Sequence, residues 1–192
     1  MKSKIILISG YPATGKSTFA KKLSEHLGIP CFKKDTIKEA MADGFGADSE
    51  EIFKKGSVAT FSVMCHIAEC FLKIGTPCIL ESNFRLSEGE ELEKLTKNSG
   101  CKVLTYVFAG DPETLYERCA IRDNSGERHW VHMAAGKDYF KNAFIDGCIK
   151  HKIGQIEVGE VINVDATDFG KIDFDELLSI AKKFIYREDY QK

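Results

Sequence analysis

Short apolar runs alternate with longer amphipathic segments along the chain. Five of the runs are predicted strands, at residues 4–9, 29–33, 78–81, 102–108 and 160–164. The first, KIILIS, is almost continuously apolar, as parallel strands are when helices cover both faces of their sheet. In the segments between the runs, apolar residues recur at helical spacing. Five strands separated by helices predict an α/β fold, with a five-stranded parallel sheet and helices on both of its faces.

Capping residues predict where several helices begin. In a capping box, a short polar side chain stands three positions before a Glu or Gln. Four pairs have this spacing: Thr36 with Glu39, Asp48 with Glu51, Ser87 with Glu90, and Asp173 with Glu176. Asp111-Pro112 predicts an N-cap followed by a proline in the first turn.

The long helix predicted after residue 50 has apolar residues at close to a 3.6-residue period. We expect these residues to face the core: Ile52, Ala59, Val63, Ile67, Cys70 and Ile74. Gly75 and Pro77 end this helix, and a further helix is predicted over about 138–150.

Length, charge and cysteine content narrow the class of protein. The 192 residues fit a single domain. The net charge of −2, from 27 Lys+Arg and 29 Asp+Glu, gives no global field that would attract nucleic acid or an anionic membrane. Seven cysteines form no C-x-x-C motif, so neither a zinc ribbon nor a redox pair is indicated. With no signal peptide and no apolar run near the roughly 20 residues that span a bilayer, we expect a cytoplasmic protein.

One motif carries clear chemistry. The segment 10–17, GYPATGKS, matches G-x-x-x-x-G-K-[ST] between a predicted strand and a predicted helix. Its backbone N–H groups are expected to surround phosphates, Lys16 to reach the outer phosphates, and the Ser17 hydroxyl to ligate Mg²⁺. We therefore expect nucleotide contacts from Gly10, Tyr11, Pro12, Ala13, Thr14, Gly15, Lys16, Ser17 and Thr18.

Other features separate the classes of P-loop protein. No Asn is followed by Lys, so the Asn-Lys-x-Asp guanine motif of GTPases is absent from the sequence. The length leaves no room for the extra subdomains of large motor ATPases. A small kinase remains.

Further blocks of sequence agree with this class. They are Phe32-Lys-Lys-Asp35, Ile79-Leu-Glu-Ser-Asn-Phe-Arg85, Arg118-x-x-x-Arg122 and Arg128-His129. With its P-loop, the chain resembles the small P-loop kinases that include chloramphenicol phosphotransferase, the zeta-toxin kinases and the kinase domain of polynucleotide kinase. The resemblance implies a three-layer P-loop kinase fold, an arginine-bearing lid at about 123–136, and ATP with Mg²⁺ as cofactors.

The resemblance also implies roles for residues that follow the strands. Asp35 would accept the proton of the acceptor hydroxyl; the alternative is a helix cap, which Thr36 and Glu39 already supply. Glu81 would order a Mg²⁺-bound water or hold the acceptor, or is an acidic strand end without a catalytic role. Asn83 and Arg85 would contact the acceptor, although Arg85 equally fits a solvated loop.

Three arginines form the implied lid. Arg118 and Arg122 share one helix face because they are four residues apart, and with Arg128 they resemble a lid that closes over the triphosphate. Arg118 would lie near the adenine. The alternative is a surface helix whose arginines pair with Glu117 and Asp123.

Two further segments have open roles. His129 and His132, on either side of Trp130, would belong to the lid or contact the acceptor. Residues 165–167 fit either backbone contacts to adenine or a plain turn.

Together these residues predict an ATP- and Mg²⁺-dependent kinase that acts on a hydroxyl of a small-molecule acceptor. A kinase of nucleic-acid 5′ ends is one alternative, against which the balanced charge argues. A nucleotide-binding regulatory or toxin-type module with a protein partner is the other. The sequence does not identify the acceptor.

Overall fold

The computed structural model describes residues 3–45, 50–126, 128–133 and 141–186. Its centre is a five-stranded sheet in the order β2-β3-β1-β4-β5, with every neighbouring pair parallel. The strands are β1 (Lys4–Gly10), β2 (Cys31–Lys33), β3 (Cys78–Glu81), β4 (Lys102–Ala109) and β5 (Glu160–Asp165). The predicted parallel sheet is confirmed, and β3 has the predicted bounds.

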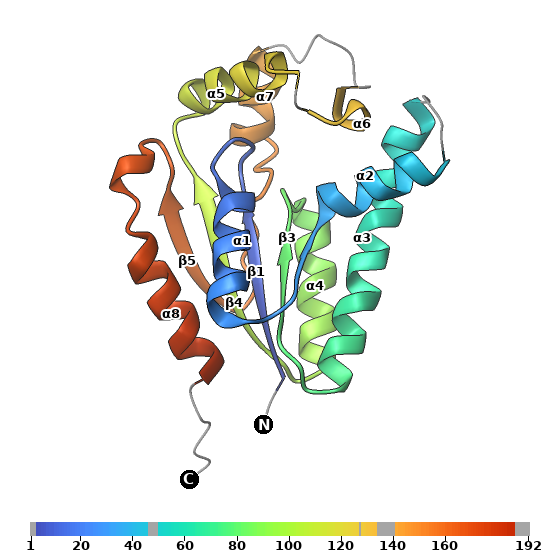
Figure 1. The fold of residues 1–192 in the computed structure, drawn as a ribbon, viewed down its shortest axis with the longest axis vertical. Coiled ribbons are helices and arrows are strands. Elements are labelled where there is room, and N and C mark those ends of the chain that lie inside the picture. The colour runs from blue at the N-terminus through green and yellow to red at the C-terminus, as the bar shows by residue number, and fades with distance from the viewer. Residues whose placement is uncertain (1–2, 46–49, 127, 134–140, 187–192) are drawn as a thin grey trace.

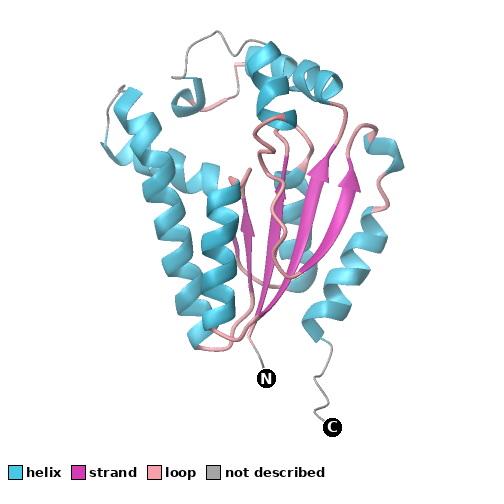
Figure 2. Cartoon of the chain, turned by 180° about the vertical axis from the view of Figure 1, so that it is seen from behind, coloured by secondary structure: helices cyan, strands magenta, loops and turns pink. Residues whose placement is uncertain are grey.

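The two faces of the sheet are covered by different helices (Figures 1 and 2). On one face, α1 (Lys16–Leu27) and α8 (Phe174–Tyr186) pack against Ile6, Ile8 and Tyr106. On the other face, α3 (Glu50–Lys73) and α4 (Leu86–Asn98) pack against Ile5 and Leu7. Because successive residues of β1 point to opposite faces, this double cover explains why all seven of them are buried.

The remaining helices gather toward the end of the sheet to which the strand arrows point (Figure 1). They are α2 (Lys34–Phe45), α5 (Pro112–Asn124), the single turn α6 (Trp130–Met133) and α7 (Lys141–Ile149). A 3₁₀ turn, η1 (Phe169–Lys171), follows β5. No helix among the described residues is both long and apolar enough to cross a membrane.

Two predicted helix starts are confirmed. The Thr114 N–H donates to Asp111 Oδ2 at 2.8 Å, with Pro112 in the first turn of α5. The Glu176 N–H donates to Asp173 Oδ1 at 2.9 Å at the start of α8. In both helices the short acidic side chain satisfies a backbone donor that has no partner within the helix.

Two other predicted starts are wrong. Helix α2 begins at Lys34, so Thr36 lies inside it and does not cap it. Helix α4 begins at Leu86, and the carboxylate that closes its first turn belongs to Glu88, which accepts from the Arg85 N–H at 3.0 Å. Ser87 and Glu90 therefore do not form the cap. In both helices the first turn contains one partner of the buried Lys34–Glu88 ion pair, a contact between distant residues that the local pattern does not show.

The Asp48–Glu51 pair and the side chain of Ile52 lie outside the described residues, as do residues 138–140 of the helix predicted over 138–150.

The predicted core stripe of α3 is also wrong. Val63 is 40% exposed and Ile74 73% exposed, whereas Phe61, Met64 and Ala68 are buried against the sheet. The helix carries apolar residues on more than one side, so periodicity alone does not determine its rotation. The large Phe and Met side chains bury more apolar area than the Val and Ile stripe would, and they determine which side faces the core.

Candidate active site

The loop between β1 and α1 has the backbone that a phosphate-binding loop requires. Gly10 has a φ of 140°, and a Cβ there would lie 2.0 Å from the Phe108 carbonyl oxygen, so only glycine fits. Gly15 is the N-cap of α1 in the left-handed conformation, with a φ of 80°. The loop therefore brings its backbone to the N-terminus of α1, where an anion is stabilised by free N–H groups and the helix dipole.

Lys16 is held within this loop and is only 5% exposed. Its Nζ donates to the Tyr11 carbonyl at 2.5 Å and to Thr14 Oγ1 at 3.3 Å. The pKa of Lys16 is lowered to about 8: burial is the main cause, Glu81 and Asp35 oppose the shift, and the nearby Arg122 adds to it. Charged residues of α2, β3 and α5 thus lie near enough to the P-loop lysine to shift its pKa, while the catalytic roles predicted for Asp35 and Arg122 stay predictions.

Glu81 ends β3 directly beside the P-loop. It lies in register with Ile8 of β1, and Ser17 Oγ donates to its Oε2 at 3.1 Å. The carboxyl is 5% exposed, and burial raises its pKa, with Asp35 adding to the rise. A hydroxyl and a carboxylate are the oxygen donors that Mg²⁺ prefers, and Mg²⁺ bound to nucleotide needs only one or two protein ligands. Ser17 and Glu81 therefore fit a Mg²⁺ ion.

The described residues contain no group of three or more His, Cys, Asp and Glu side chains that could hold a metal ion by themselves.

Asp35 stands in the first turn of α2 and is exposed. It acts on the pKa of two lysines, raising that of Lys16 in the P-loop and that of Lys38 one turn further along α2. Its carboxylate therefore lies near both the P-loop lysine and a second group of charges. The nearby strand ends explain this position, because β2 and β3 are paired with Lys33 opposite Glu81.

The second group of charges surrounds Lys38. Besides Asp35, the side chains that shift its pKa are Lys34, Arg128 and Arg85, all of which lower it, and burial lowers it most. The sequence analysis singled out Arg85, Arg128 and Asp35 but missed both lysines of α2. For Lys34 the available signal was its place directly after β2 and before Asp35; nothing in the local sequence singled out Lys38.

Lys34 is neutralised by a partner that the sequence did not reveal. Its Nζ forms a 2.5 Å ion pair with Glu88 Oε1, and each side chain is 9% exposed. The pair joins the start of α2 to the start of α4, residues 54 positions apart.

Arg118 lies on the opposite side of the P-loop from α2 and contacts the turn after β5. Its guanidinium donates to the carbonyls of Ala166 and Thr167 at 2.6 and 2.5 Å, and it stacks 4.0 Å from the centre of the Phe169 ring. The Phe169 ring in turn packs beside Gly15. Arg118 and residues 165–167, both predicted on the adenine side, are therefore neighbours.

Arg122 and Arg128 both pair with Asp123. The Arg122 Nε lies 3.3 Å from Asp123 Oδ1, and Arg128 Nη1 bonds to the same oxygen. The ion pairs proposed in the surface-helix alternative are thus present for Asp123. Arg122 contributes to lowering the pKa of Lys16, and Arg128 to lowering that of Lys38.

Two histidines fasten α6 to α2. His129 Nε2 lies 3.0 Å from Asp43 Oδ1, and His132 Nε2 lies 2.9 Å from Glu39 Oε1. Trp130 stands between them, with its ring centre 5.4 Å from that of His129. These contacts support the prediction that the histidines belong to the segment over the site, and the sequence gave no sign of their carboxylate partners.

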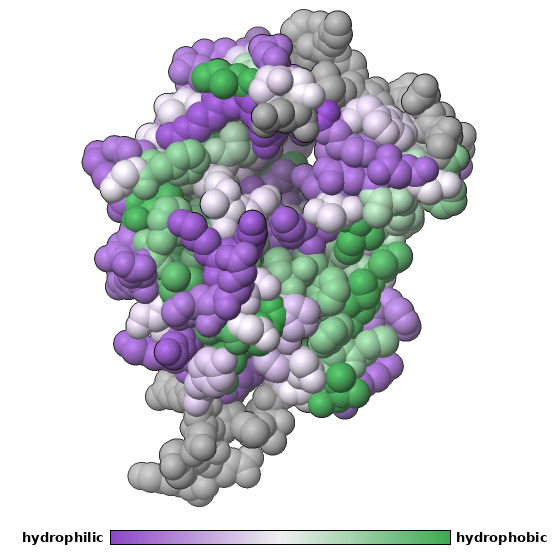
Figure 3. Space-filling view, viewed as in Figure 1, coloured by the Kyte–Doolittle hydropathy of each residue, from purple (hydrophilic) through white to green (hydrophobic). Residues whose placement is uncertain are grey.

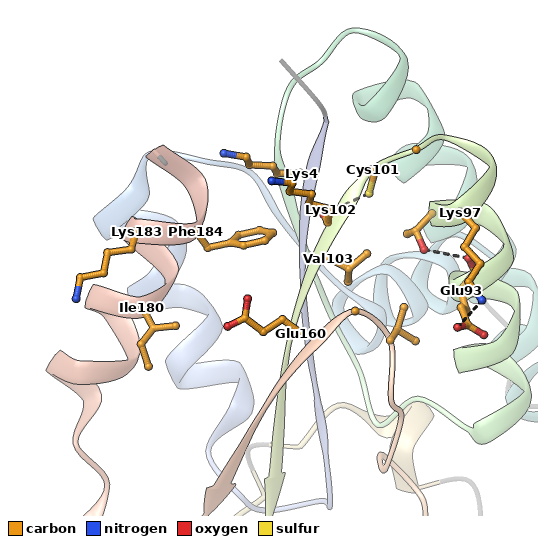
Figure 4. A pocket seen from close by; sticks show the side chains of 14 residues that line it. Lys4, Glu93, Lys97, Cys101, Lys102, Val103, Glu160, Ile180, Lys183 and Phe184 are labelled. Atoms are coloured by element: carbon orange, nitrogen blue, oxygen red, sulfur yellow. Dashed lines mark hydrogen bonds and ion pairs between the residues drawn. The ribbon is translucent and has the colours of Figure 1, made fainter. Parts of the chain in front are cut away.

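A hollow of about 820 Å³ lies at the other edge of the sheet (Figure 4). Lys4, Lys102 and Glu160 line it where β1, β4 and β5 begin, beside Phe184 of α8. Open parallel sheets bind ligands at the carboxyl ends of their strands. The hollow is therefore separate from the site formed by the P-loop, Glu81 and Asp35.

Comparison with known proteins agrees with this geometry. Residues 5–143 match the family AAA_33, described as an AAA domain, and the match runs from β1 through the P-loop to α7. The chain belongs to this family.

Individual relatives are kinases. A curated adenylate kinase from Kosmotoga olearia is 31% identical over 125 residues, which make up 61% of this chain and 58% of that protein. A crystal structure of a candidate kinase from Chloroflexus aurantiacus has a TM-score of 0.83 at 25% identity, covering 95% of this chain and 98% of that one. Shikimate kinase from Bacteroides thetaiotaomicron shares the fold, with a TM-score of 0.54 at 15% identity over 95% of this chain and 98% of that one.

These matches confirm a small P-loop kinase fold that binds nucleotide. The arginine-bearing lid and the individual site residues stay predictions.

Proposed function

We propose that the protein is an ATP- and Mg²⁺-dependent kinase that transfers the γ-phosphoryl group to a hydroxyl of a small-molecule acceptor. One observation supports the proposal: Asp35, in the first turn of α2 directly after β2, lies near enough to the P-loop Lys16 and to Lys38 of α2 to raise the pKa of each. A carboxylate at the boundary between a nucleotide site and a second site is placed to receive a hydroxyl proton.

The nucleotide side uses residues already in position. The backbone of residues 10–17 and the Lys16 ammonium would bind the phosphates, and Ser17 with Glu81 would hold Mg²⁺, which bridges phosphate oxygens and neutralises their charge. Phosphate oxygens would replace the Tyr11 carbonyl as the partner of the Lys16 Nζ.

On the acceptor side, the orientation of the hydroxyl matters more than the basicity of the group that accepts its proton. Phosphoryl transfer depends chiefly on positioning and on neutralising charge, so an exposed carboxylate such as that of Asp35 is sufficient. Arg122, close to Lys16, would stabilise charge on the transferring group, as guanidinium does without changing its protonation.

The balanced composition supports a small acceptor. Nucleic-acid kinases must bind a run of phosphates, which requires an extended basic groove. The net charge of −2 gives no such excess.

The test is ADP release from Mg·ATP over a panel of nucleosides, sugars, sugar acids, antibiotics and a 5′-hydroxyl oligonucleotide. We expect one small-molecule class to stimulate the wild type, and Lys16→Met to lose at least about 100-fold of that stimulated rate, since a P-loop lysine stabilises the transferring phosphoryl group. Lys21→Met is the matched control because it removes an exposed lysine of the same helix. Full stimulated turnover in Lys16→Met, or stimulation by the oligonucleotide alone, would contradict the proposal.

A further inference from the structure

Tyr11 joins the phosphate-binding loop to two other elements of the fold. Its backbone N–H donates to the Phe108 carbonyl of β4 at 2.8 Å, which fastens the start of the loop to the sheet. Its hydroxyl donates to the Cys148 carbonyl of α7 at 3.0 Å, across 137 positions of the chain. The residue is therefore held at its backbone by the sheet and at the tip of its ring by α7.

The Tyr11 ring also packs against a small apolar cluster between α5 and α7. The buried members of this cluster are Leu115, Cys119, Phe144 and Cys148. Ala13 of the loop, which has a left-handed φ of 59°, packs against the same cluster. Figure 3 shows hydrophilic residues around the hollow between α2 and the helices α5 and α7, whereas the members of the cluster are buried. The loop is thus docked on the two helices through an apolar contact.

The Tyr11 carbonyl is the point at which the loop holds its lysine. It accepts from Lys16 Nζ at 2.5 Å and from Thr14 Oγ1 at 2.7 Å. Because both the N–H and the side chain of Tyr11 are anchored outside the loop, this carbonyl has little freedom to turn away from Lys16. The resting position of the lysine therefore depends on contacts with β4 and α7.

The same cluster connects Tyr11 to the helix that carries the arginines. Arg122 Nη2 donates to Cys119 Sγ at 3.2 Å, and Cys119 is a buried member of the cluster that the Tyr11 ring contacts. The proposed function places Lys16 and Arg122 on the nucleotide phosphates. Both are connected to Tyr11, the lysine through its carbonyl and the arginine through the cluster.

From these contacts we infer that Tyr11 is a positioning residue, which holds Lys16 and Arg122 in the alignment that nucleotide phosphates require. When phosphates replace its carbonyl as the partner of Lys16, Tyr11 keeps its hydrogen bonds to Thr14 and to α7, so the loop stays docked on the helices. The inference rests on the nucleotide site of the proposed function but not on its acceptor chemistry. Nucleotide binding alone therefore tests it.

Tyr11→Phe removes the hydroxyl and keeps the ring in the cluster. A fixed carbonyl beside an ammonium favours the charged form, so a loosened carbonyl should let Lys16 lose its proton at lower pH. Isothermal titration calorimetry with Mg·ADP at pH 7, 8 and 9 measures this. We expect the loss of affinity between pH 7 and pH 8 to grow from about twofold in the wild type to about threefold or more. Tyr11→Ala, which also removes the ring, should enlarge the effect.

Tyr116→Phe is the matched control. Tyr116 lies in α5, and its ring packs against that of Phe144 with 5.8 Å between the ring centres. Its hydroxyl has no hydrogen bond within the part of the chain that the structure describes, so its removal should leave the affinity at each pH within twofold of the wild type. Thermal unfolding shows which variants remain folded, and if Tyr11→Ala does not, Tyr11→Phe decides the outcome.

A double-variant cycle tests the connection to Arg122. The affinity for a non-hydrolysable Mg·ATP analogue is measured for Tyr11→Phe, Arg122→Gln and the two combined. Each single change should weaken binding about threefold or more. The combined loss should be at least about threefold smaller than the product of the single losses, because without the arginine Tyr11 has only Lys16 to position.

The outcomes separate this inference from the proposed function. The inference is overturned if Tyr11→Phe keeps the wild-type pH profile, if its loss multiplies with that of Arg122→Gln, or if Tyr116→Phe has the same effects. Nucleotide binding that depends on Tyr11, without transfer to any acceptor, supports the inference and counts against the kinase. Transfer that depends on Lys16, in a protein whose nucleotide binding does not change in Tyr11→Phe, supports the kinase and overturns the inference.

Discussion

Lys16 has little contact with solvent, and its ammonium is held by a carbonyl of its own loop. Both features matter for nucleotide binding. Burial favours the neutral amine, whereas the phosphates of a nucleotide require the charged form. The P-loop lysine of the free protein therefore has a pKa, of about 8, that lies within an accessible pH range.

This predicts a pH-dependent affinity for Mg·ADP. The lysine is mostly protonated at pH 7 and mostly neutral at pH 9, because its pKa is about 8, so affinity should fall as the pH rises. The decrease between those values should be about tenfold, as expected for one required proton. Isothermal titration calorimetry at pH 7, 8 and 9 measures it. Lys16→Arg, whose side chain stays charged, should bind with a flatter profile; a wild-type affinity that is constant to pH 9 would show that the lysine is not the titrating group.

Sequence information was strongest for single residues that carry a motif. The spacing of the P-loop motif predicted that Lys16 and Ser17 begin the helix after the first strand. The predicted strand ends indicated that Asp35 and Glu81 lie at the same edge of the sheet. The sequence could not reveal the surroundings of Lys38, because Arg85 and Arg128, two of the four charged residues near it, are more than 40 positions away in the sequence.

At the scale of elements, the start of α2 is fixed by a contact between distant residues. Lys34 and Glu88 bury an ion pair where α2 meets α4, and Glu88 also accepts the N–H of Arg85. The position of Asp35 depends on this contact, since it is the next residue after Lys34.

Removing one partner of the pair should destabilise the fold. Glu88→Ala leaves Lys34 as an unpaired buried charge, which costs about 3–5 kcal/mol of the free energy of unfolding in such cases. Urea unfolding measures the change. The double variant Lys34→Met with Glu88→Leu should recover most of it, because no buried charge remains unpaired.

Glu93→Ala is the control for this comparison. Glu93 forms a 2.8 Å pair with Lys97 on the surface of α4, and exposed pairs of this kind contribute less than about 1 kcal/mol. If Glu88→Ala costs no more than Glu93→Ala, the buried pair does not hold α2 in place.

The strands could be predicted from the sequence more closely than the helices. The strands follow from sequence because a buried parallel strand is an uninterrupted apolar run, and β3 matches residue for residue. The rotation of α3 does not follow from the sequence, because Val63 and Met64 are both apolar. Only the packing of the whole domain determines which of the two side chains is buried. The predicted start of α2 is also wrong, because Lys34 at its first position contacts Glu88 of α4, a residue far away in the sequence.

At the scale of the whole molecule, the parallel sheet assembles the site. Since all five strands point the same way, the P-loop after β1, Glu81 at the end of β3 and Asp35 after β2 arrive at one edge. The helices α5, α6 and α7 lie at this edge as well, and the histidines of the α6 segment connect it to α2. The proposed nucleotide and acceptor sites would therefore share one edge, with Asp35 near both.

The most direct test of this account separates nucleotide binding from turnover in Asp35→Asn. Asparagine preserves the size of the side chain and removes the proton acceptor, so we expect the affinity for Mg·ADP to stay within about twofold of wild type. Acceptor-dependent ADP release should fall by at least about 100-fold, within the range for loss of general-base catalysis. If nucleotide affinity and turnover fall together, or if turnover is retained, Asp35 is not the residue that joins the two sites and the account is wrong.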